Sequence, residues 1–469
     1  MGARDPQTKT PYGGFIYEPA PFSLRPTRFG KAAFNKAYGL ARPFNHVVHQ
    51  ASSQYSWLKE AVGTAAKGDA EFTGKLVSLA DEVLSRGRKQ TVVLGILRSD
   101  YMLHGDSLES AVPLQVELNT IASSFGCLSA KMTRMHQQLS ASSLSSSVNE
   151  GPQALPDNNA DTGIANGLAL ALTEYKRQFP GGTTADSNSK PSEVVVVMVV
   201  QPGETNSCDQ RDLEFVLGAR HGVRVLRKSL AELATEAEHI GANDELWLTK
   251  EQVRVGVVYF RAGYTPDDYP TNKEWEARAF VEHSAAIKCP DVFYHLFGAK
   301  KVQQAIAAPG MLRQFCRSDE EEQTLASSFA GLYALGEGDD SEIVQRALRD
   351  PHGFVLKPQR EGGGNNLYDD DLVHALKTMS YEERGAFILM QKILPPLTEG
   401  QLVRGGKVVY DGKCVCELGV FGISLRDYAS DRVLLDNVVG HILRSKSAGT
   451  DEGGVAAGYA FLSSPELVE

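Results

Sequence analysis

Hydrophobic positions recur along this chain with two spacings, one typical of helices and the other of strands. Within the range Leu76–Leu84 the apolar residues lie three and four apart, which predicts a helix, and Gly87 stands where such a helix ends. The largely apolar runs Thr91–Leu97 and Val194–Val200 predict buried strands. The chain is therefore expected to fold as a mixed α/β protein.

A lobe of alternating strands and helices is predicted from residue 193 onward. Strands are expected at Val194–Val200, Val223–Leu226 and Val255–Phe260, and helices at Asp209–Arg220 and Ser229–Glu236. Such alternation is typical of a small parallel sheet covered by helices. Further helices are expected at Gly167–Phe179, Glu274–Ile287, Pro290–Phe297 and Leu372–Met379, and a further strand at Ala386–Gln391. Because residues 181–192 are rich in Gly, Ser and Thr, we predict three domains, 1–192, 193–299 and 300–469.

The segment Leu114–Asn119 alternates strictly between apolar and polar residues, which predicts a strand with two unlike faces. Leu114, Val116 and Leu118 are expected to face a core, and Gln115, Glu117 and Asn119 to share the other face. Glu117 and Asn119 would then direct two oxygen ligands toward one hard cation. The competing interpretation is an ordinary solvated sheet face.

A phosphate-handling loop is predicted after residue 354. The apolar run Phe354–Leu356 predicts a buried strand, and Lys357 leaves it as a cation. Gly362, Gly363 and Gly364 follow, and without Cβ atoms they let backbone N–H groups approach a triphosphate. Glu361 beside phosphate implies a divalent cation such as Mg²⁺ between them. A flexible turn is the alternative, and neither the Walker A nor the Gly-x-Gly-x-x-Gly pattern is present.

Two other polar segments suit the binding of a peptide. A second glycine-rich segment, 452–458, follows Arg444 and Lys446, and backbone N–H groups with an arginine can clamp a carboxylate. In the predicted lobe, the segments 204–210 and 261–264 come at strand ends, where arginine can bind a carboxylate and Glu or Gln an ammonium group. Polar loops of this kind are also commonly just solvated.

Composition limits the partners and the compartment. The net charge of −10 and the lack of a basic stripe argue against a nucleic-acid partner. The cysteines are scattered without Cys-x-x-Cys pairs, which fits reduced thiols in a cytosolic enzyme. Cys414 and Cys416 lack further Cys or His partners nearby, so a metal there is disfavoured. The longest strongly apolar run, Val194–Val200, is far too short to span a bilayer.

The two glycine-rich segments together, Lys357–Asn366 and Glu452–Gly458, resemble the paired signatures of eukaryotic-type glutathione synthetases, which are ATP-grasp ligases. The segments Val116–Thr120 and Lys288–Asp291 occur in the family's order. The resemblance implies an ATP-grasp fold with an inserted small parallel α/β substrate-binding domain and glycine-rich lid loops. It also implies that γ-glutamylcysteine is ligated to glycine through an acyl phosphate, with ADP and phosphate released. The helix with which family members open, before Ala20–Leu24, is expected to be missing.

The resemblance assigns roles to particular residues. The magnesium ligands would be Glu117, Asn119 and Glu361, and the catalytic residues Arg98, Ser124, Gly362 and Gly363. The residues that would bind ATP are Glu117, Lys300, Lys357, Pro358, Gln359, Arg360, Glu361, Gly362, Gly363, Gly364, Asn365, Asn366, Tyr368, Met390, Gln391, Lys392, Ile393, Glu417, Lys446 and Glu452. The residues that would bind the peptide substrates are Arg98, Ile121, Ala122, Ser123, Ser124, Glu204, Thr205, Asn206, Gln210, Arg261, Ala262, Gly263, Tyr264, Arg444, Val455 and Ala456.

Some of these assignments have ordinary alternatives. On position alone, Arg98 is equally well explained as a surface salt-bridge partner, and Lys300 with Lys301 as surface charge. Thr205 stands where a longer polar side chain is expected. Gln391 replaces an acidic residue often found there, but recognition of adenine would use the backbone.

Two other functions are left open by the sequence. One is a related ligase with another acceptor such as β-alanine, although Val455 and Ala456 argue for glycine. The other is an ATP-binding regulator that has lost catalysis. The resemblance further implies a cytoplasmic homodimer that uses small-molecule substrates and binds neither nucleic acid nor membrane.

Overall fold

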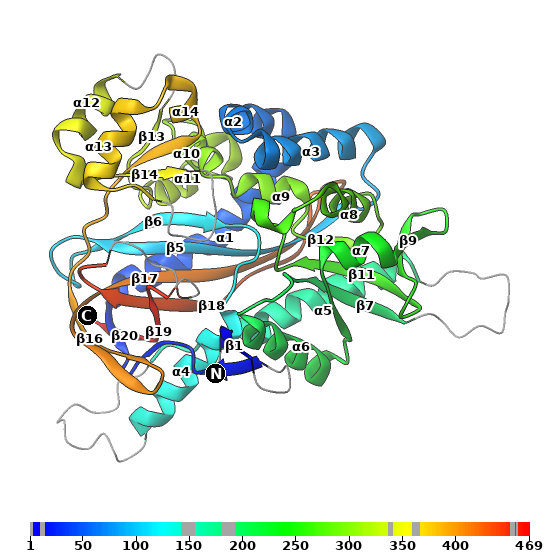
Figure 1. Ribbon diagram of the computed structural model, residues 1–469, viewed down its shortest axis with the longest axis horizontal. Helices are drawn as coiled ribbons and strands as arrows, with labels where there is room; N and C mark the ends of the chain where they lie inside the picture. The colour runs from blue at the N-terminus through cyan, green and yellow to red at the C-terminus, as the bar shows by residue number, and fades with distance from the viewer. Residues whose placement is uncertain are drawn as a thin grey trace.

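The computed structural model describes residues 3–9, 15–141, 155–180, 193–335, 341–358, 366–450, 455 and 458–469. At its centre four antiparallel strands lie in the order β6 (Val112–Asn119), β5 (Val92–His104), β17 (Lys407–Asp427) and β18 (Arg432–Ser447) (Figure 1). Beyond β18 the sheet continues through β19 (Phe461–Ser463), β3 (Phe22–Ser23) and β16 (Thr398–Arg404). Two smaller pairs are β1 (Ala3–Lys9) with β2 (Phe15–Glu18) and β4 (Thr27–Gly30) with β20 (Pro465–Val468).

The predicted parallel lobe is present and joins the same sheet. Its parallel strands are β7 (Val194–Val199), β8 (Val225–Lys228), β11 (Val253–Phe260) and β12 (Ile287–Cys289). The antiparallel strands β9 (Ala237–Ile240) and β10 (Glu245–Leu248) extend its edge. β12 pairs with β5 through Lys288 and Val93, so the sheet is continuous across the domain boundary that we predict at residue 192. The linker 181–192 lies outside the described residues, and the division into three domains stays a prediction.

Helices cover both faces of the central strands because both faces are apolar. On one face α1 (Lys31–Ser53) packs against β5 and β17, and its core includes Leu97 and Tyr101. On the other face α4 (Gly126–Ala141) and α5 (Ala160–Gln178) lie against the sheet with Leu94 and Ile96 (Figure 1). The remaining helices of this part are α2 (Tyr55–Gly68), α3 (Lys75–Arg86), α6 (Ser207–His221), α7 (Leu230–Glu236), α8 (Asn272–Glu282), α9 (Val292–Phe297), α10 (Lys300–Ile306) and α11 (Asp319–Ala326).

A separate small antiparallel sheet stands beyond the edge of β6 (Figure 1, upper left). It contains β13 (Leu332–Ala334), β15 (Phe387–Gln391) and β14 (Phe354–Pro358), in that order, with helices α12 (Ser341–Arg349), α13 (Asp369–Thr378) and α14 (Tyr381–Gly385). Val355, Met390 and Ile393 from this unit pack with Leu114 of β6. This contact brings the small sheet over one face of the large one.

Several predicted boundaries need correction. The strand predicted at Thr91–Leu97 continues to His104, so Arg98 lies inside a strand and not at its carboxyl end. Helix α8 ends at Glu282, and Ile287 opens a strand, because its side chain enters the core between β11 and β5. Helix α5 begins at Ala160, before the predicted start.

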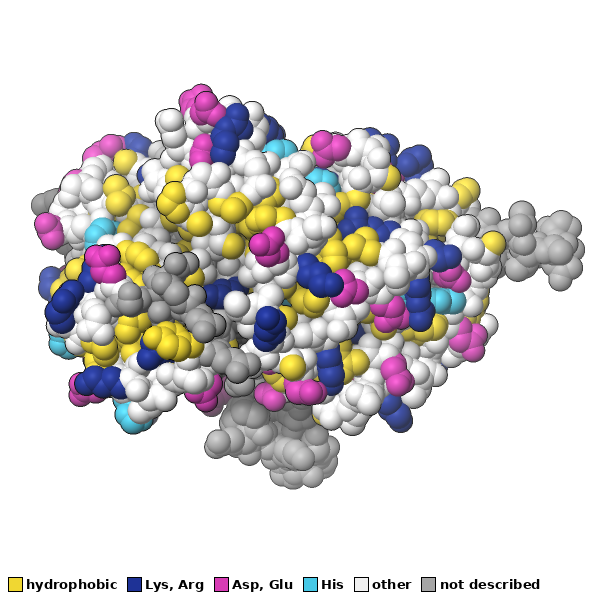
Figure 2. Space-filling model, turned by 90° about the horizontal axis from the view of Figure 1, so that it is seen from above, with side chains coloured by type: hydrophobic (Ala, Val, Ile, Leu, Met, Phe, Trp, Pro, Cys, Tyr) yellow, Lys and Arg dark blue, Asp and Glu magenta, His cyan; other side chains and the backbone are white. Residues whose placement is uncertain are grey.

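On the face drawn in Figure 2, basic and acidic side chains of the described residues are interspersed, and neither kind gathers into an extended patch. In the described parts of the chain, no helix has the length and apolar character needed to cross a membrane.

Candidate active site

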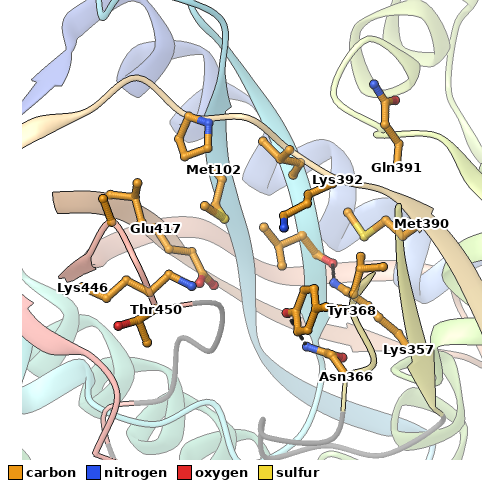
Figure 3. A pocket seen from close by; sticks show the side chains of 16 residues that line it. Met102, Lys357, Asn366, Tyr368, Met390, Gln391, Lys392, Glu417, Lys446 and Thr450 are labelled. Carbon is orange, nitrogen blue, oxygen red and sulfur yellow. Dashed lines mark hydrogen bonds between the residues drawn. The ribbon is translucent and has the colours of Figure 1, made fainter. Parts of the chain in front are cut away.

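A cavity of about 190 Å³ lies between the small sheet and the central sheet (Figure 3). Of the predicted ATP-binding residues, it is lined by Lys357, Asn366, Tyr368, Met390, Gln391, Lys392, Ile393, Glu417 and Lys446. Lys392 lies over the ring of Tyr368, with its Nζ 5.4 Å from the ring centroid. Val116 and Val355 supply apolar walls. The cavity thus combines an apolar slot with several lysines, as a purine nucleotide requires.

The segment that follows β15 forms one wall of this cavity. The side chain of Gln391 points away from the cavity (Figure 3), and its Oε1 accepts a hydrogen bond from the Gly331 N–H at 3.1 Å. This side chain therefore supports the neighbouring strand β13. Residue 391 faces the cavity with its backbone. The presence of Gln391 in place of an acidic residue therefore leaves this wall of the cavity unchanged.

Strand β6 contains a bulge that the alternation of its sequence conceals. Glu117 pairs with Asp100 of β5, but Gln115 pairs with Tyr101, so Val116 is an extra residue in the ladder. Gln115 consequently turns to the α1 side, where its Nε2 donates to Ser99 Oγ at 2.6 Å. The prediction that Gln115 shares a face with Glu117 and Asn119 is therefore wrong.

The same bulge corrects the predicted apolar face. Leu114 packs with the residues beside the cavity, and Val116 lines the cavity itself, whereas Leu118 joins the core on the α1 side. Glu117 and Asn119 are half-buried, so their face is not an ordinary solvated one. The prediction that they share a face is confirmed, since Asn119 Nδ2 donates to Glu117 Oε1 at 3.2 Å, and their binding of one cation stays a prediction.

Four cations surround the carboxylate of Glu117. Burial by itself would raise the pKa of this carboxyl, but Lys300, Lys357, Arg444 and Arg98 outweigh it and hold the pKa at about 2. Lys300 is buried at the start of α10, so it is not a surface charge. Lys357 is buried too and donates to the Val116 carbonyl at 3.2 Å (Figure 3).

An ion-pair cluster lies on the cavity side of β5, β17 and β18. Arg98 donates through Nε and Nη2 to the two oxygens of Asp100, at 2.7 and 2.8 Å. Arg444 donates to Asp100 Oδ2 at 2.8 Å and also to Glu417. Burial raises the pKa of Glu417, as do the neighbouring carboxylates Asp100 and Glu117, whereas Arg444 opposes the shift. Arg98 is therefore a buried member of the site and not a surface salt-bridge partner.

The loop after β6 connects Arg98 to a second arginine, Arg261. Arg98 Nη1 donates to the Ser124 carbonyl at 3.3 Å, and the next backbone N–H, of Phe125, donates to Asp209 at 3.0 Å. Asp209 also accepts from Arg261 Nη2 at 3.2 Å. Two of the predicted peptide-binding arginines are thus linked through one short loop. Asp209 escaped prediction because its role, capping α4 and holding Arg261, comes from tertiary contacts.

The remaining predicted peptide-binding residues lie on neighbouring loops. Glu204 accepts from the Asn206 N–H at 2.6 Å and from Gln210 Nε2 at 2.8 Å, whereas Arg227 donates to Gln210 Oε1. Thr205 is half-buried between them. The loop Ala262–Tyr264 is fixed by Asp268, which accepts from the Gly263 and Tyr264 N–H groups at 2.7 and 3.0 Å.

The loop Ile121–Ser124 bends sharply at Ala122, which has a positive φ of 52°. Ser123 Oγ donates to the Ile96 carbonyl at 3.1 Å, which anchors the loop to β5. Ile121 and Tyr264 line a further cavity of about 370 Å³, on the side of α9. Ile121 and Tyr264 therefore lie between the predicted peptide-binding loops and this second cavity.

Some predicted site residues lie outside the described residues, namely Gln359, Arg360, Glu361, Gly362, Gly363, Gly364, Asn365, Glu452 and Ala456. Pro358 ends β14, and Val455 is buried in the core on the α5 side. Among the residues that are described, no cluster of three His, Cys, Asp or Glu side chains could hold a metal. Cys414 and Cys416 are buried free thiols.

Comparisons with known proteins agree with this geometry. The chain matches the family described as eukaryotic glutathione synthase, ATP binding domain, over residues 3–467. Glutathione synthetase from Dictyostelium discoideum is 38% identical, with 95% of this chain and 91% of that protein covered. The human glutathione synthetase is 37% identical, with 98% and 92% covered, and the chloroplastic enzyme of Arabidopsis thaliana is 40% identical, with 96% and 79% covered.

A solved structure extends the comparison to the fold. The glutathione synthetase-like effector GSS30 from Globodera pallida, in its apo form, superposes with a TM-score of 0.74 at 22% identity, covering 97% of this chain and 91% of that one. The fold, the lysine-lined cavity and the family match define an ATP-dependent ligase of the ATP-grasp class. The chain belongs to the eukaryotic glutathione synthetase family.

Proposed function

We propose that this protein joins γ-glutamylcysteine to glycine and converts ATP to ADP and phosphate. The observation that carries the proposal is the cluster of Arg98, Asp100 and Arg444 beside a cavity lined by lysines, in a chain of this family. Two guanidinium groups on one sheet face suit two substrates that each present a carboxylate. The lysines of the cavity suit the phosphates of the third substrate.

The proposed reaction has two steps. In the first, a carboxylate oxygen of the dipeptide attacks the γ-phosphorus of ATP, a new oxygen–phosphorus bond forms, and ADP leaves. In the second, the amine of glycine attacks the acyl carbon of this acyl phosphate, the bond from that carbon to the phosphate oxygen breaks, and inorganic phosphate leaves as the amine loses a proton and the peptide bond forms. Such chemistry depends on positioning and on charge neutralisation, which is what a site made of arginines, lysines and few nucleophiles supplies.

Individual residues take separate tasks in this proposal. Three of the five N–H groups of Arg98 are used by Asp100 and Ser124, which leaves two for the carboxylate of the dipeptide. Lys300 and Lys357 neutralise the phosphates, since both are buried beside Glu117. Arg444 takes the carboxylate of glycine. The peptide's amino-terminal part lies against Arg261 and Gln210.

Magnesium fits the donor set that the described residues offer. The carboxylate of Glu117 is ionised because cations hold its pKa at about 2, and the amide of Asn119 adds a neutral oxygen. Mg²⁺ favours such oxygen donors and is usually held by one or two carboxylates together with substrate phosphates. Glu361, the third ligand that we predict, lies outside the described residues. When bound, the ion neutralises charge on the transferred phosphoryl group.

A direct assay tests this function. Purified protein is incubated with ATP, Mg²⁺, γ-glutamylcysteine and glycine, and the products are identified by mass spectrometry. We expect glutathione and ADP in equal amounts. Faster product formation with β-alanine than with glycine would make the protein the related ligase, and a single-turnover reaction without ADP would make it an inactive regulator.

Assembly and location are separate proposals. We expect a homodimer, which analytical ultracentrifugation would detect as twice the mass of one chain. We also expect a cytoplasmic protein, which imaging of a tagged chain in its own cells would test. Two of the relatives, from Arabidopsis thaliana and Solanum lycopersicum, are named as chloroplastic, so a plastid location is the alternative outcome of this test.

A further inference from the structure

We propose that Asp100 is a positioning residue that fixes Arg98 and Arg444, the arginines of the two peptide substrates, relative to each other. The inference rests on the proposed function and concerns a residue to which the sequence resemblance gives no role. Asp100 is completely buried on β5. Its Oδ1 accepts from Arg98, and its Oδ2 accepts from Arg98, Arg444 and Asn119, at 2.8, 2.8 and 3.1 Å.

The position of Asp100 in the sheet explains how one carboxylate reaches three partners. Asp100 pairs with Glu117 of β6 on one side and with Gly419 of β17 on the other. Arg444 comes from β18, one strand further, where it pairs with Glu417, and its side chain reaches back across β17 to Asp100. The carboxylate therefore connects side chains of three of the four central strands, β5, β6 and β18, at the level of the site.

Gly419 supplies independent evidence that this arrangement needs space. A Cβ atom at Gly419 would lie 2.5 Å from Asp100 Oδ1 and 2.9 Å from Arg98 Cδ. Both distances are shorter than nonbonded atoms tolerate, so a side chain here would displace the Arg98–Asp100 pair, and also Ile442, whose Cγ2 would lie 2.7 Å from the same Cβ. The glycine is not required by its backbone, which runs in regular antiparallel pairing. Its lack of a side chain is the feature that the ion pair uses.

Asp100 also orients the predicted metal ligand Asn119. The Nδ2 of Asn119 donates to both Asp100 and Glu117, so the two carboxylates occupy the amino group of the amide. The amide oxygen is consequently left for a cation. One buried carboxylate thus sets the geometry of the dipeptide arginine, the glycine arginine and a magnesium ligand.

The substitution Asp100→Asn tests this role, because it keeps the size of the side chain and removes its charge. We expect the KM values for γ-glutamylcysteine and for glycine to rise by about 10- to 100-fold, the factor that corresponds to losing a charge-assisted hydrogen bond. The dissociation constant of ADP, measured by calorimetry, should change much less. We expect kcat to fall by about 100-fold because the reacting groups are misplaced.

Asp436→Asn is the matched control. Asp436 accepts from Arg426 at 2.9 Å and from Asn45 at 2.8 Å, and its side chain is 5% exposed, so it is a carboxylate shielded from solvent with an arginine and an asparagine, toward the other end of β17 and β18. Its loss should lower the melting temperature and leave both KM values unchanged. Equal KM increases in the two variants would refute a specific role of Asp100.

Gly419→Ala is the second test variant, because it disturbs the ion pair without removing a polar group. We expect it to raise the same two KM values. If Asp100→Asn fails to fold, this variant alone tests whether the Arg98–Asp100 pair positions the substrates. If the wild type is active and both variants keep its KM values for the two peptide substrates, the positioning role is refuted. Wild-type protein that forms no glutathione refutes the proposed function instead, so the two failures are distinguishable.

Discussion

Arg444 of β18 lies directly opposite Glu417 of β17, and its guanidinium donates to the Glu417 carboxylate. Glu417 lines the nucleotide cavity, whereas Arg444 is the arginine that we assign to glycine. One ion pair therefore touches two of the three proposed substrate positions. Binding of the nucleotide and binding of the amino-acid acceptor should depend on it together.

Glu417→Gln is expected to raise the KM for both ATP and glycine, each by about tenfold. The amide keeps the size of the side chain but lacks the charge that holds Arg444 in place. Steady-state kinetics with each substrate varied in turn would measure both effects. A rise in the KM for ATP alone would show that the ion pair does not connect the two positions.

The neighbouring lysines Lys300 and Lys301 form a matched pair. Both are buried at the start of α10, and the charge of Lys300 is the largest of those that lower the pKa of Glu117. Burial lowers the pKa of Lys301. We expect Lys300→Met to lower kcat by about 100-fold, as loss of a donor to developing charge does. Lys301→Met should leave kcat near the wild-type value, and equal losses in the two variants would contradict this assignment.

Glu117→Gln should weaken the binding of the metal and leave the fold intact. The carboxylate is ionised and surrounded by cations, so the amide removes negative charge without changing shape. We expect the apparent affinity for Mg²⁺ to fall by about 10- to 100-fold. Binding of Mn²⁺ followed by electron paramagnetic resonance provides a measurement that does not depend on activity. Glu361→Gln should act in the same direction, and an unchanged metal titration in both variants would exclude this pair of ligands.

His441 should make the protein less stable in mild acid. Burial lowers the pKa of this histidine to about 3, and its Nδ1 lies 2.5 Å from the Tyr38 hydroxyl. The unfolded chain takes up a proton below pH about 6.5 while the folded chain does not, so stability is lost as the pH falls through this window.

Urea unfolding of the wild type and of His441→Gln at pH 7 and pH 5 would test this linkage. The wild type should lose about 2 kcal/mol more free energy of unfolding than the variant over this interval. His374 is exposed on α13, and His374→Gln should retain the wild-type pH dependence. A pH dependence that is the same in all three proteins would show that His441 does not contribute.

The sequence predicts elements well where the local pattern is long and simple. The helix ending at Gly87 and the parallel strands β7 and β11 follow directly from periodicity. The predicted cavity residues, which come from four separate segments, also meet, and their assignment follows from the family resemblance and not from local patterns. Local patterns cannot, however, report which strands pair, and the union of the parallel lobe with β5 was therefore missed.

The errors have physical reasons that a sequence pattern does not contain. The bulge at Val116 is set by how β6 pairs with β5, and perfect alternation gives no sign of an extra residue. Asp100 and Asp209 look like ordinary surface carboxylates in the sequence. They become site residues only because arginines from distant segments, Arg444 and Arg261, fold onto them.

The short strand β12 has a mechanical consequence. It spans Ile287–Cys289, and its register with β5 is the pairing of Lys288 with Val93. This pairing, together with the packing of α4 and α5 on the lobe, joins the strand that carries Arg98 to the lobe that carries Arg261. We expect a substitution in β12 to shift the lobe against the strands and so to change the separation of the two arginines. The size of dipeptide that the enzyme accepts would then depend in part on a segment that need not touch it.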